Sequence, residues 1–138
     1  MVARDMAVVF WIRVAMPETN RAASVGKLKH LSPMIHSQYS DMLVVVGRAV
    51  KGFQQLFQRD YLPILMSTTR TAWLIMCWAH NMDHSGVDIT FQTSLQLAWI
   101  VGGRALARGI VKSCVRCRFL RNKINQGVEH EAPTPLQL

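Results

Sequence analysis

Two pairs of potential metal ligands constrain this chain more than any other feature of its sequence. His80 and His84 are separated by three residues, Cys114 and Cys117 by two, and 29 residues lie between the pairs. A C-x-x-C turn lets two sulfurs approach one ion, and two histidines four positions apart can converge from a helix end and the loop after it. Two thiolates and two neutral imidazoles suit tetrahedral Zn²⁺, so the pattern predicts one zinc ion.

The ligand count indicates what kind of zinc site this would be. Four protein ligands leave no position open for water, which favours a structural over a catalytic ion. Asn81 stands where an H-E-x-x-H metalloprotease would carry its glutamate, so we do not expect that activity. Taken alone, Cys114 and Cys117 could also form a redox-active dithiol, and this alternative stays open.

The remaining cysteine and histidines are interpreted more simply. Three cysteines with one close pair do not resemble a secreted disulfide framework, so we expect an intracellular protein of the nucleus or cytoplasm. Cys77 is expected to be a small buried hydrophobic residue and not a ligand. No run reaches 18 apolar residues, so no transmembrane helix and no membrane partner are predicted. The other histidines are expected to be exposed: His30, His36 and His130.

The charge distribution suggests a polyanionic partner. The 138 residues, enough for one domain, carry a formal net charge of +8. Seven basic residues and no acidic residue fall within 104–123, namely Arg104, Arg108, Lys112, Arg116, Arg118, Arg121 and Lys123. Such a cluster can neutralise phosphates and bind DNA with little sequence preference. The alternative is a solvated basic surface. Nothing predicts a small-molecule substrate.

The upstream segments predict short strands. We expect 1–27 to be an irregular, poorly determined segment and 28–67 a short β-strand region. Within it, 31–33 would be extended, while 42–47 and 60–66 are apolar runs that would form a β-hairpin with a long connection. Pro63 would place the second of these strands at a sheet edge.

The segment 68–125 predicts a small bundle of three helices, which makes the fold mainly α. Ser67, Thr68 or Thr69 can cap the first helix. Four residues on one face of this helix recur at helical spacing, namely Leu74, Cys77, Trp78 and Asn81.

The rest of this segment predicts two further helices around an extended piece. A second helix would begin at Asp88 or Thr90 and end at Leu97, residues 99–101 would be extended, and a third helix would span 104–113. This third helix would bury a stripe formed by Leu106, Ile110, Val111 and Cys114. The tail 126–138 contains Pro133 and Pro135 and should be a linker-like, irregular segment.

Several short motifs surround the ligand pairs. They are Leu74-Ile75, Ala79-His80, His84-Ser85-Gly86-Val87, Thr90, Trp99-Ile100, Gly103-Arg104 and Cys114 to Cys117. With these motifs, 80–121 resembles the His-His-Cys-Cys zinc-binding domain of integrases, in particular that of BEL/Pao-type retrotransposon polyproteins. Upstream, LSP at 31–33, VVVGR at 44–48 and YLPIL at 61–65 extend the likeness to about 28–126, although Val46 replaces a frequent glycine.

The resemblance implies a zinc-binding module that originates in a mobile element and contacts DNA, itself or other integrase domains. In the family this domain precedes a catalytic core with three carboxylates. The acidic residues of this chain are scattered, so integrase catalysis is not carried over and the chain is expected not to be an enzyme. A protein-interaction module without DNA binding, or a non-functional remnant, is the alternative.

Overall fold

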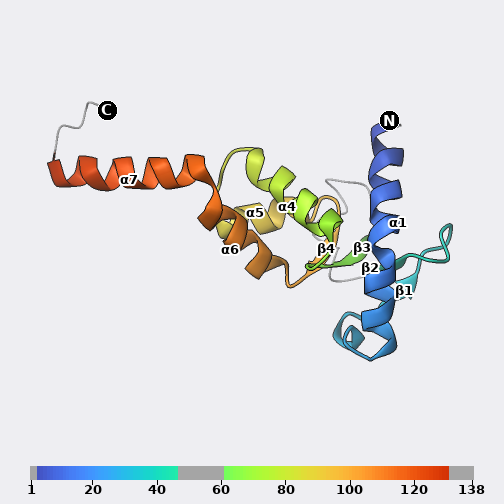
Figure 1. Ribbon diagram of the computed structural model, residues 1–138. Helices are drawn as coiled ribbons and strands as arrows, with labels where there is room; N and C mark the ends of the chain where they lie inside the picture. The colour runs from blue at the N-terminus through green and yellow to red at the C-terminus, as the bar shows by residue number, and fades with distance from the viewer. Residues whose placement is uncertain (1–2, 47–60, 131–138) are drawn as a thin grey trace.

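The computed structural model of the chain describes residues 3–46 and 61–130, and within them the fold is mainly α, as predicted (Figure 1). The helices are α1 (Ala3–Ser24), α4 (Arg70–Asn81), α5 (Val87–Ser94), α6 (Gly103–Ser113) and α7 (Val115–His130), with a short 3-10 helix η1 (Lys29–Leu31). The strands are β1 (Met34–Ile35), β2 (Leu43–Val46), β3 (Tyr61–Met66) and β4 (Trp99–Val101). The prediction of three helices and one hairpin is therefore incomplete.

The four strands form one sheet in the order β1-β2-β3-β4. The predicted hairpin is present, since β2 and β3 are antiparallel with Val44 opposite Pro63, and its connection lies outside the described residues. β4 is parallel to β3, and α4 and α5 form the crossover that a parallel pair requires. The expectation that β3 lies at an edge is wrong, although β4 begins to pair only at Ile64, one residue after Pro63.

Both faces of the sheet are buried at β3. Leu65 and Ile100 pack with residues of α1 and α4 in one apolar cluster, while Leu62 and Ile64 pack on the other side with Leu28 and Leu95. A strand covered on both faces reads as a continuous apolar run, which explains the sequence YLPILM of β3. The predicted extended piece at 31–33 is wrong, because η1 ends at Leu31, Ser32 is left-handed and β1 begins at Met34.

The N-terminal segment is helical, which corrects the prediction that 1–27 is irregular. Pro17 lies inside α1 and costs about 3 kcal/mol in a helix interior. Burial of Ile12 and Met16 offsets this cost, because each such side chain contributes about 1.5–3 kcal/mol. The positions that α1 buries recur at helical spacing: Ile12, Ala15, Met16, Thr19 and Ala22.

Two buried hydroxyl groups attach α1 to the rest of the molecule. Thr19 donates a hydrogen bond from Oγ1 to the carbonyl of Ile64 in β3, at 2.8 Å. Thr71 of α4 donates one to the carbonyl of Trp11, at 2.9 Å. Both bonds satisfy polar groups within the interface, so α1 packs in a fixed register against β3 and α4.

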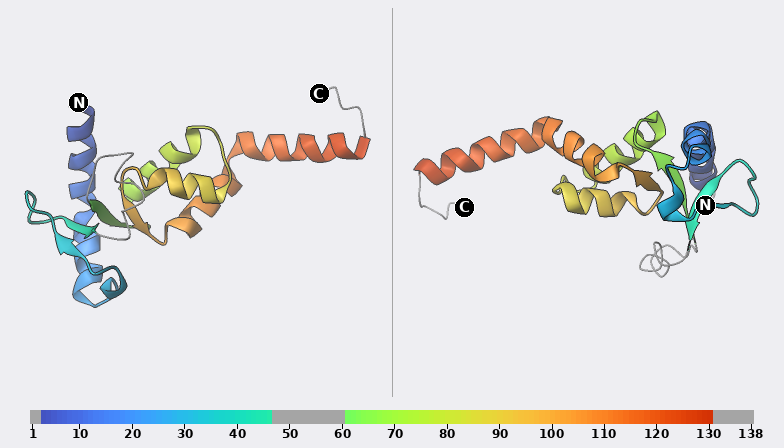
Figure 2. Two further views of the ribbon diagram at one scale, coloured as in Figure 1. Left: turned by 180° about the vertical axis from the view of Figure 1, so that it is seen from behind. Right: turned by 90° about the horizontal axis from the view of Figure 1, so that it is seen from below.

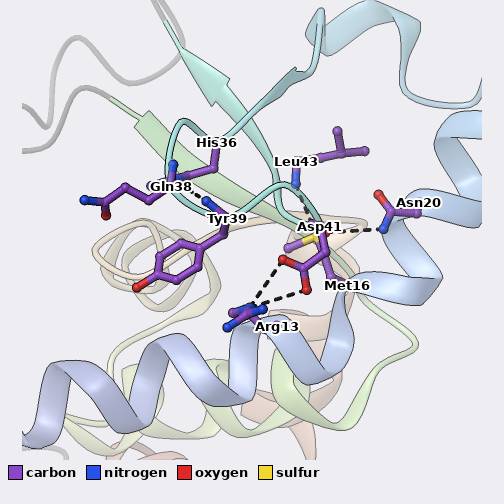
Figure 3. Close-up of polar contacts among 8 residues, drawn as sticks. All are labelled: Arg13, Met16, Asn20, His36, Gln38, Tyr39, Asp41 and Leu43. Atoms are coloured by element: carbon purple, nitrogen blue, oxygen red, sulfur yellow. Dashed lines mark hydrogen bonds and ion pairs between the residues drawn. The ribbon is translucent and has the colours of Figure 1, made fainter.

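The segment between β1 and β2 lies against α1 (Figure 3). Arg13 forms an exposed ion pair with Asp41, and its guanidinium lies 4.9 Å from the ring centre of Tyr39. Asn20 donates a hydrogen bond to the carbonyl of Asp41, and the amide of Leu43 lies 3.5 Å from the sulfur of Met16. Exposed ion pairs contribute little, so packing around Met16 holds this segment more firmly than the Arg13–Asp41 pair does.

His36 is buried, with 7% of its surface exposed, so the expectation that it is exposed is wrong. Its Nδ1 accepts hydrogen bonds from the backbone amides of Gln38 and Tyr39 (Figure 3). Its ring also packs edge-on against that of Tyr61. His36 is thus a structural residue of the turn. His30 is exposed as expected, and the side chain of His130 lies outside those described.

The three predicted helices of the bundle are present as α4, α5 and α6. Thr69 is the N-cap of α4, where its Oγ1 accepts a hydrogen bond from the amide of Ala72. The predicted stripe on α4 is displaced by about one residue, because Leu74 and Asn81 are exposed. The residues that α4 buries are Thr71, Ala72, Ile75, Met76, Ala79 and His80. The second helix, α5, begins earlier and ends earlier than expected.

Two glycines allow α6 to begin close to its neighbours. Gly102, the N-cap residue, has φ of +79°, which a residue with a side chain rarely adopts. A Cβ at Gly103 would lie 2.7 Å from the ring of Phe91 in α5, so only glycine fits there. The predicted stripe of α6 is half-buried at Leu106 and Ile110, around the fully buried Ala107.

The last helix, α7, extends away from the body at the end opposite α1, as Figure 1 and Figure 2 show. It continues to His130, so the first residues of the expected irregular tail, 126–130, are helical, and 131–138 lie outside the described residues. None of the described helices combines the length and apolar character needed to cross a membrane.

If α1 belongs to the core, truncating its buried face must destabilise the whole protein. We expect Met16→Ala, at a side chain with 0% exposure, to lower the free energy of unfolding by about 2–5 kcal/mol in urea denaturation. Val14→Ala, at a side chain of the same helix with 50% exposure, should change it by less than about 0.5 kcal/mol. Equal effects of the two variants would contradict this packing.

Candidate metal centre

The four predicted ligands come together where three helices end or begin. His80 lies in the last turn of α4, and His84 lies in the loop between α4 and α5. Cys114 is the residue between α6 and α7, and Cys117 lies in the first turn of α7. One donor atom from each of the four residues lies within 4.8 Å of every other, close enough to hold a single metal ion. The prediction that these residues form one cluster is therefore confirmed.

The distances between donor atoms fit a tetrahedral zinc ion. Zn–S bonds of about 2.3 Å and Zn–N bonds of about 2.0–2.1 Å place sulfur and nitrogen about 3.6 Å apart in a tetrahedron. Here Cys117 Sγ lies 3.3 Å from His80 Nε2 and 3.9 Å from His84 Nδ1, and Cys114 Sγ lies 3.4 Å from His84 Nδ1. The observed distances lie on either side of the required value, so the cluster needs little rearrangement to bind zinc.

His84 has a backbone conformation that non-glycine residues seldom adopt. Its φ is +53°, in the left-handed region, and its amide donates a 2.7 Å hydrogen bond to the carbonyl of His80. This turn reverses the chain directly after α4 and brings the two imidazole rings to 4.8 Å between centres. Strained backbone of this kind concentrates at functional sites, which fits a ligand role for His84.

The start of α7 favours a thiolate at Cys114. The hydrogen bond from the backbone amide of Cys117 lowers the pKa of Cys114, and the positive end of a helix dipole acts in the same direction. Burial raises the pKa of Cys117, and its hydrogen bond to the Cys114 sulfur raises that pKa further.

Burial also prepares His80 to act as a ligand. Its side chain is 1% exposed, and this desolvation, followed by the nearby His84, lowers the pKa of the His80 imidazole. Since only the neutral ring can bind a metal ion, the fold favours the form that zinc needs.

Cys77 does not join the cluster. It is half-buried on α4, and burial raises the pKa of its thiol, so it remains protonated. This agrees with its expected role as a small apolar side chain, although its burial is only partial.

The seven basic residues predicted to contact nucleic acid are all exposed on α6 and α7. Arg104 differs from the others, because it forms an ion pair with Asp88 and lies over the ring of Phe91, at 5.1 Å. Arg104 therefore joins α6 to α5 and is partly neutralised. Among the residues that the structure describes, no ion pair involves the remaining six: Arg108, Lys112, Arg116, Arg118, Arg121 and Lys123.

The sequence interpretation did not assign a role to a hydroxyl group beside the cluster. Thr90 is fully buried in the first turn of α5, and its Oγ1 lies 3.2 Å from His80 Nδ1. Since Nδ1 is hydrogen-bonded to Thr90, Nε2 is the His80 nitrogen that faces the sulfur of Cys117. The sequence placed Thr90 near the start of the second helix but could not show which side chain it meets.

Comparisons of the chain with protein-family models, curated proteins and solved structures find no match. The likeness to integrase zinc domains therefore depends on the residues and spacings of this sequence alone.

The geometry predicts one zinc ion per chain. In native mass spectrometry we expect a single zinc adduct that is lost in His80→Ala and in Cys117→Ser, because three ligands hold the ion much less tightly than four. Cys77→Ala, a thiol outside the cluster, is the matched control and should keep the adduct. A wild-type chain without zinc, or loss of zinc on mutating Cys77, would contradict this ligand set.

Proposed function

We propose that this chain is a non-catalytic zinc-binding module, in which one structural Zn²⁺ joins the end of α4 to the junction of α6 and α7. The observation that carries the proposal is the convergence of four donor atoms within 4.8 Å. Two imidazoles and two thiolates fill the coordination sphere of the ion, which leaves no open position for a substrate or an activated water. The two thiolates also neutralise the charge of the ion.

The expected contribution of the metal is large compared with the stability of a small domain. Structural zinc contributes about 10–16 kcal/mol in zinc-finger peptides, and a whole domain is stable by about 5–15 kcal/mol. Here an apolar core that spans α1, the sheet, α4 and α6 exists beside the cluster. The metal should therefore matter most for α7, whose Val115 and Phe119 are 77% and 62% exposed and add little burial.

The motifs around the ligands support a finer proposal, that the module derives from a retrotransposon integrase-like polyprotein. Gly103 and Phe91 form the tight α5–α6 contact, and Thr90 meets His80, so these motif positions have defined roles around the cluster. The alternatives are a module that assembles proteins without binding DNA and a remnant without function.

Removing the metal should release α7 before it unfolds the core. In hydrogen exchange of the chelator-treated chain, we expect amides of α7 and of the loop 82–86 to lose protection, because Cys114, Cys117 and His84 lose their common partner. Amides of β3 and the buried face of α4 should remain protected longer, and adding back zinc should restore α7.

The outcome that contradicts this prediction is unchanged exchange of α7 after complete metal removal. A chain that never held zinc but shows rapid disulfide formation between Cys114 and Cys117 would favour the redox interpretation. Under the zinc interpretation, Cys114 and Cys117 should react with an alkylating reagent more slowly in the zinc-loaded protein than in the same protein after chelation.

We also propose a second role, contact with nucleic acid through α6 and α7. Six exposed basic side chains in 108–123 have no ion-pair partner among the described residues, and 104–123 contains no acidic residue. Phosphates can replace water around such cations and release counterions from DNA. Because α7 projects from the body (Figure 2), its basic residues are accessible from several sides.

This role predicts salt-sensitive binding of generic duplex DNA. The triple substitution of Arg116, Arg118 and Arg121 by Gln should weaken binding by roughly 10-fold or more in fluorescence anisotropy at low salt and reduce the salt slope by about 3. Lys27→Gln with Lys29→Gln changes exposed charges near η1 and should reduce binding much less.

DNA binding, attraction by net charge and protein assembly predict different results. Losses in proportion to the charges removed, three in one set of variants and two in the other, would indicate attraction by net charge alone. An absence of DNA binding at low salt, together with concentration-dependent dimerisation in sedimentation, would favour the assembly module.

A further inference from the structure

We infer that Thr90 is a positioning residue of the metal centre, which selects the tautomer of His80 and at the same time holds the loop that carries His84. The inference rests on the proposed function, because it concerns a zinc ion bound by His80 and His84. Thr90 would not touch the ion itself but would fix the direction of two of its four ligands.

The hydrogen bonds of Thr90 define which nitrogen of His80 carries the proton. Thr90 Oγ1 lies 3.3 Å from the carbonyl oxygen of Ser85 and 3.2 Å from His80 Nδ1. The carbonyl can only accept, so the single hydroxyl proton goes to Ser85 and Oγ1 accepts from Nδ1–H. His80 Nε2 is then unprotonated, and its lone pair is available on the side where Cys117 Sγ lies at 3.3 Å.

Burial stabilises the His80 tautomer that carries the proton on Nδ1. Thr90 is 0% exposed and His80 is 1% exposed, so water cannot replace the hydroxyl as a partner for Nδ1–H. A buried donor left without a partner is unfavourable, so loss of the hydroxyl would populate the other tautomer or a rotated ring. Ligand orientation by hydrogen bonds of this kind is general at metal sites.

The same side chain also fixes the position of His84. Ser85, whose carbonyl accepts from Thr90, follows His84 directly, and the amide of Thr90 donates to the carbonyl of Gly86 at 3.0 Å. The loop between α4 and α5 is therefore attached to α5 at two successive residues after the ligand. Because His84 has φ of +53°, these bonds help retain a backbone that is otherwise unfavourable.

The test compares the zinc affinity of Thr90→Val, which keeps the shape but removes the hydroxyl, with that of Thr90→Ser, which keeps the hydroxyl. In competition with a chromophoric chelator, we expect Thr90→Val to bind zinc about 10- to 100-fold more weakly and Thr90→Ser to be close to wild type. Ser94→Ala is the matched control, since Ser94 is a fully buried hydroxyl residue of α5 that bonds to the carbonyl of Phe91 instead of a ligand.

A second measurement reports the tautomer directly. In nitrogen-15 NMR of the zinc-loaded wild type, His80 should show a slowly exchanging proton on Nδ1 and a metal-bound Nε2. In Thr90→Val this proton should exchange faster, whereas Ser94→Ala should leave it unchanged.

The outcomes separate the inference from the proposed function. If wild type binds zinc and Thr90→Val binds it equally well with the same imidazole signals, Thr90 has no positioning role. Equal weakening by Ser94→Ala, or failure of Thr90→Ser to restore affinity, would also overturn the inference, because either result indicates a general packing effect. A wild type that binds no zinc overturns the proposed function itself.

Discussion

The convergence of three helix boundaries at one point governs this structure. The end of α4, the loop after it and the α6–α7 junction each bring a polar donor into a space where the donors lie within 4.8 Å of one another. Imidazoles and thiols packed together without a cation gain only weak hydrogen bonds, and the unusual backbone of His84 adds a cost. A tetrahedral cation would convert the same atoms into strong ligands, so we interpret this junction as a metal centre.

The predictable part of the fold is the part with local rules. The ligand spacings, the Thr69 cap and the helical periods of α4 to α6 depend on residues a few positions apart, so the sequence indicates them directly. Which face of a helix is buried cannot be predicted from such local spacings. On α4, both Leu74 and Ile75 belong to helical stripes, and contact with α1 and the sheet decides that Ile75 is buried and Leu74 exposed.

The errors of sequence interpretation have a common cause, which is packing between distant segments. Pro17 argues against a helix locally, yet α1 forms because its buried stripe packs on strands that lie far along the chain, such as β3 at 61–66. His36 looks like an ordinary surface residue until Tyr61 covers it. Pro63 suggests that β3 lies at a sheet edge. However, β4 pairs with β3 from Ile64 onward, because the crossover through α4 and α5 places Trp99 opposite Ile64. None of these partners is visible within a short sequence window.

The core and α7 differ in how many apolar side chains they bury, and this difference indicates which part of the protein the metal would stabilise most. The body of the molecule has two apolar clusters that hold the sheet, α1, α4 and α6 together. By comparison, α7 extends into solvent with Phe119 and Ile124 each 62% exposed, and it is anchored at the end that carries Cys114 and Cys117. Since an isolated helix of this length is marginal in water, the anchor determines both its order and its direction. Under the proposed function, metal binding would therefore control how α7 presents its basic residues, and Thr90, by orienting His80, would influence both.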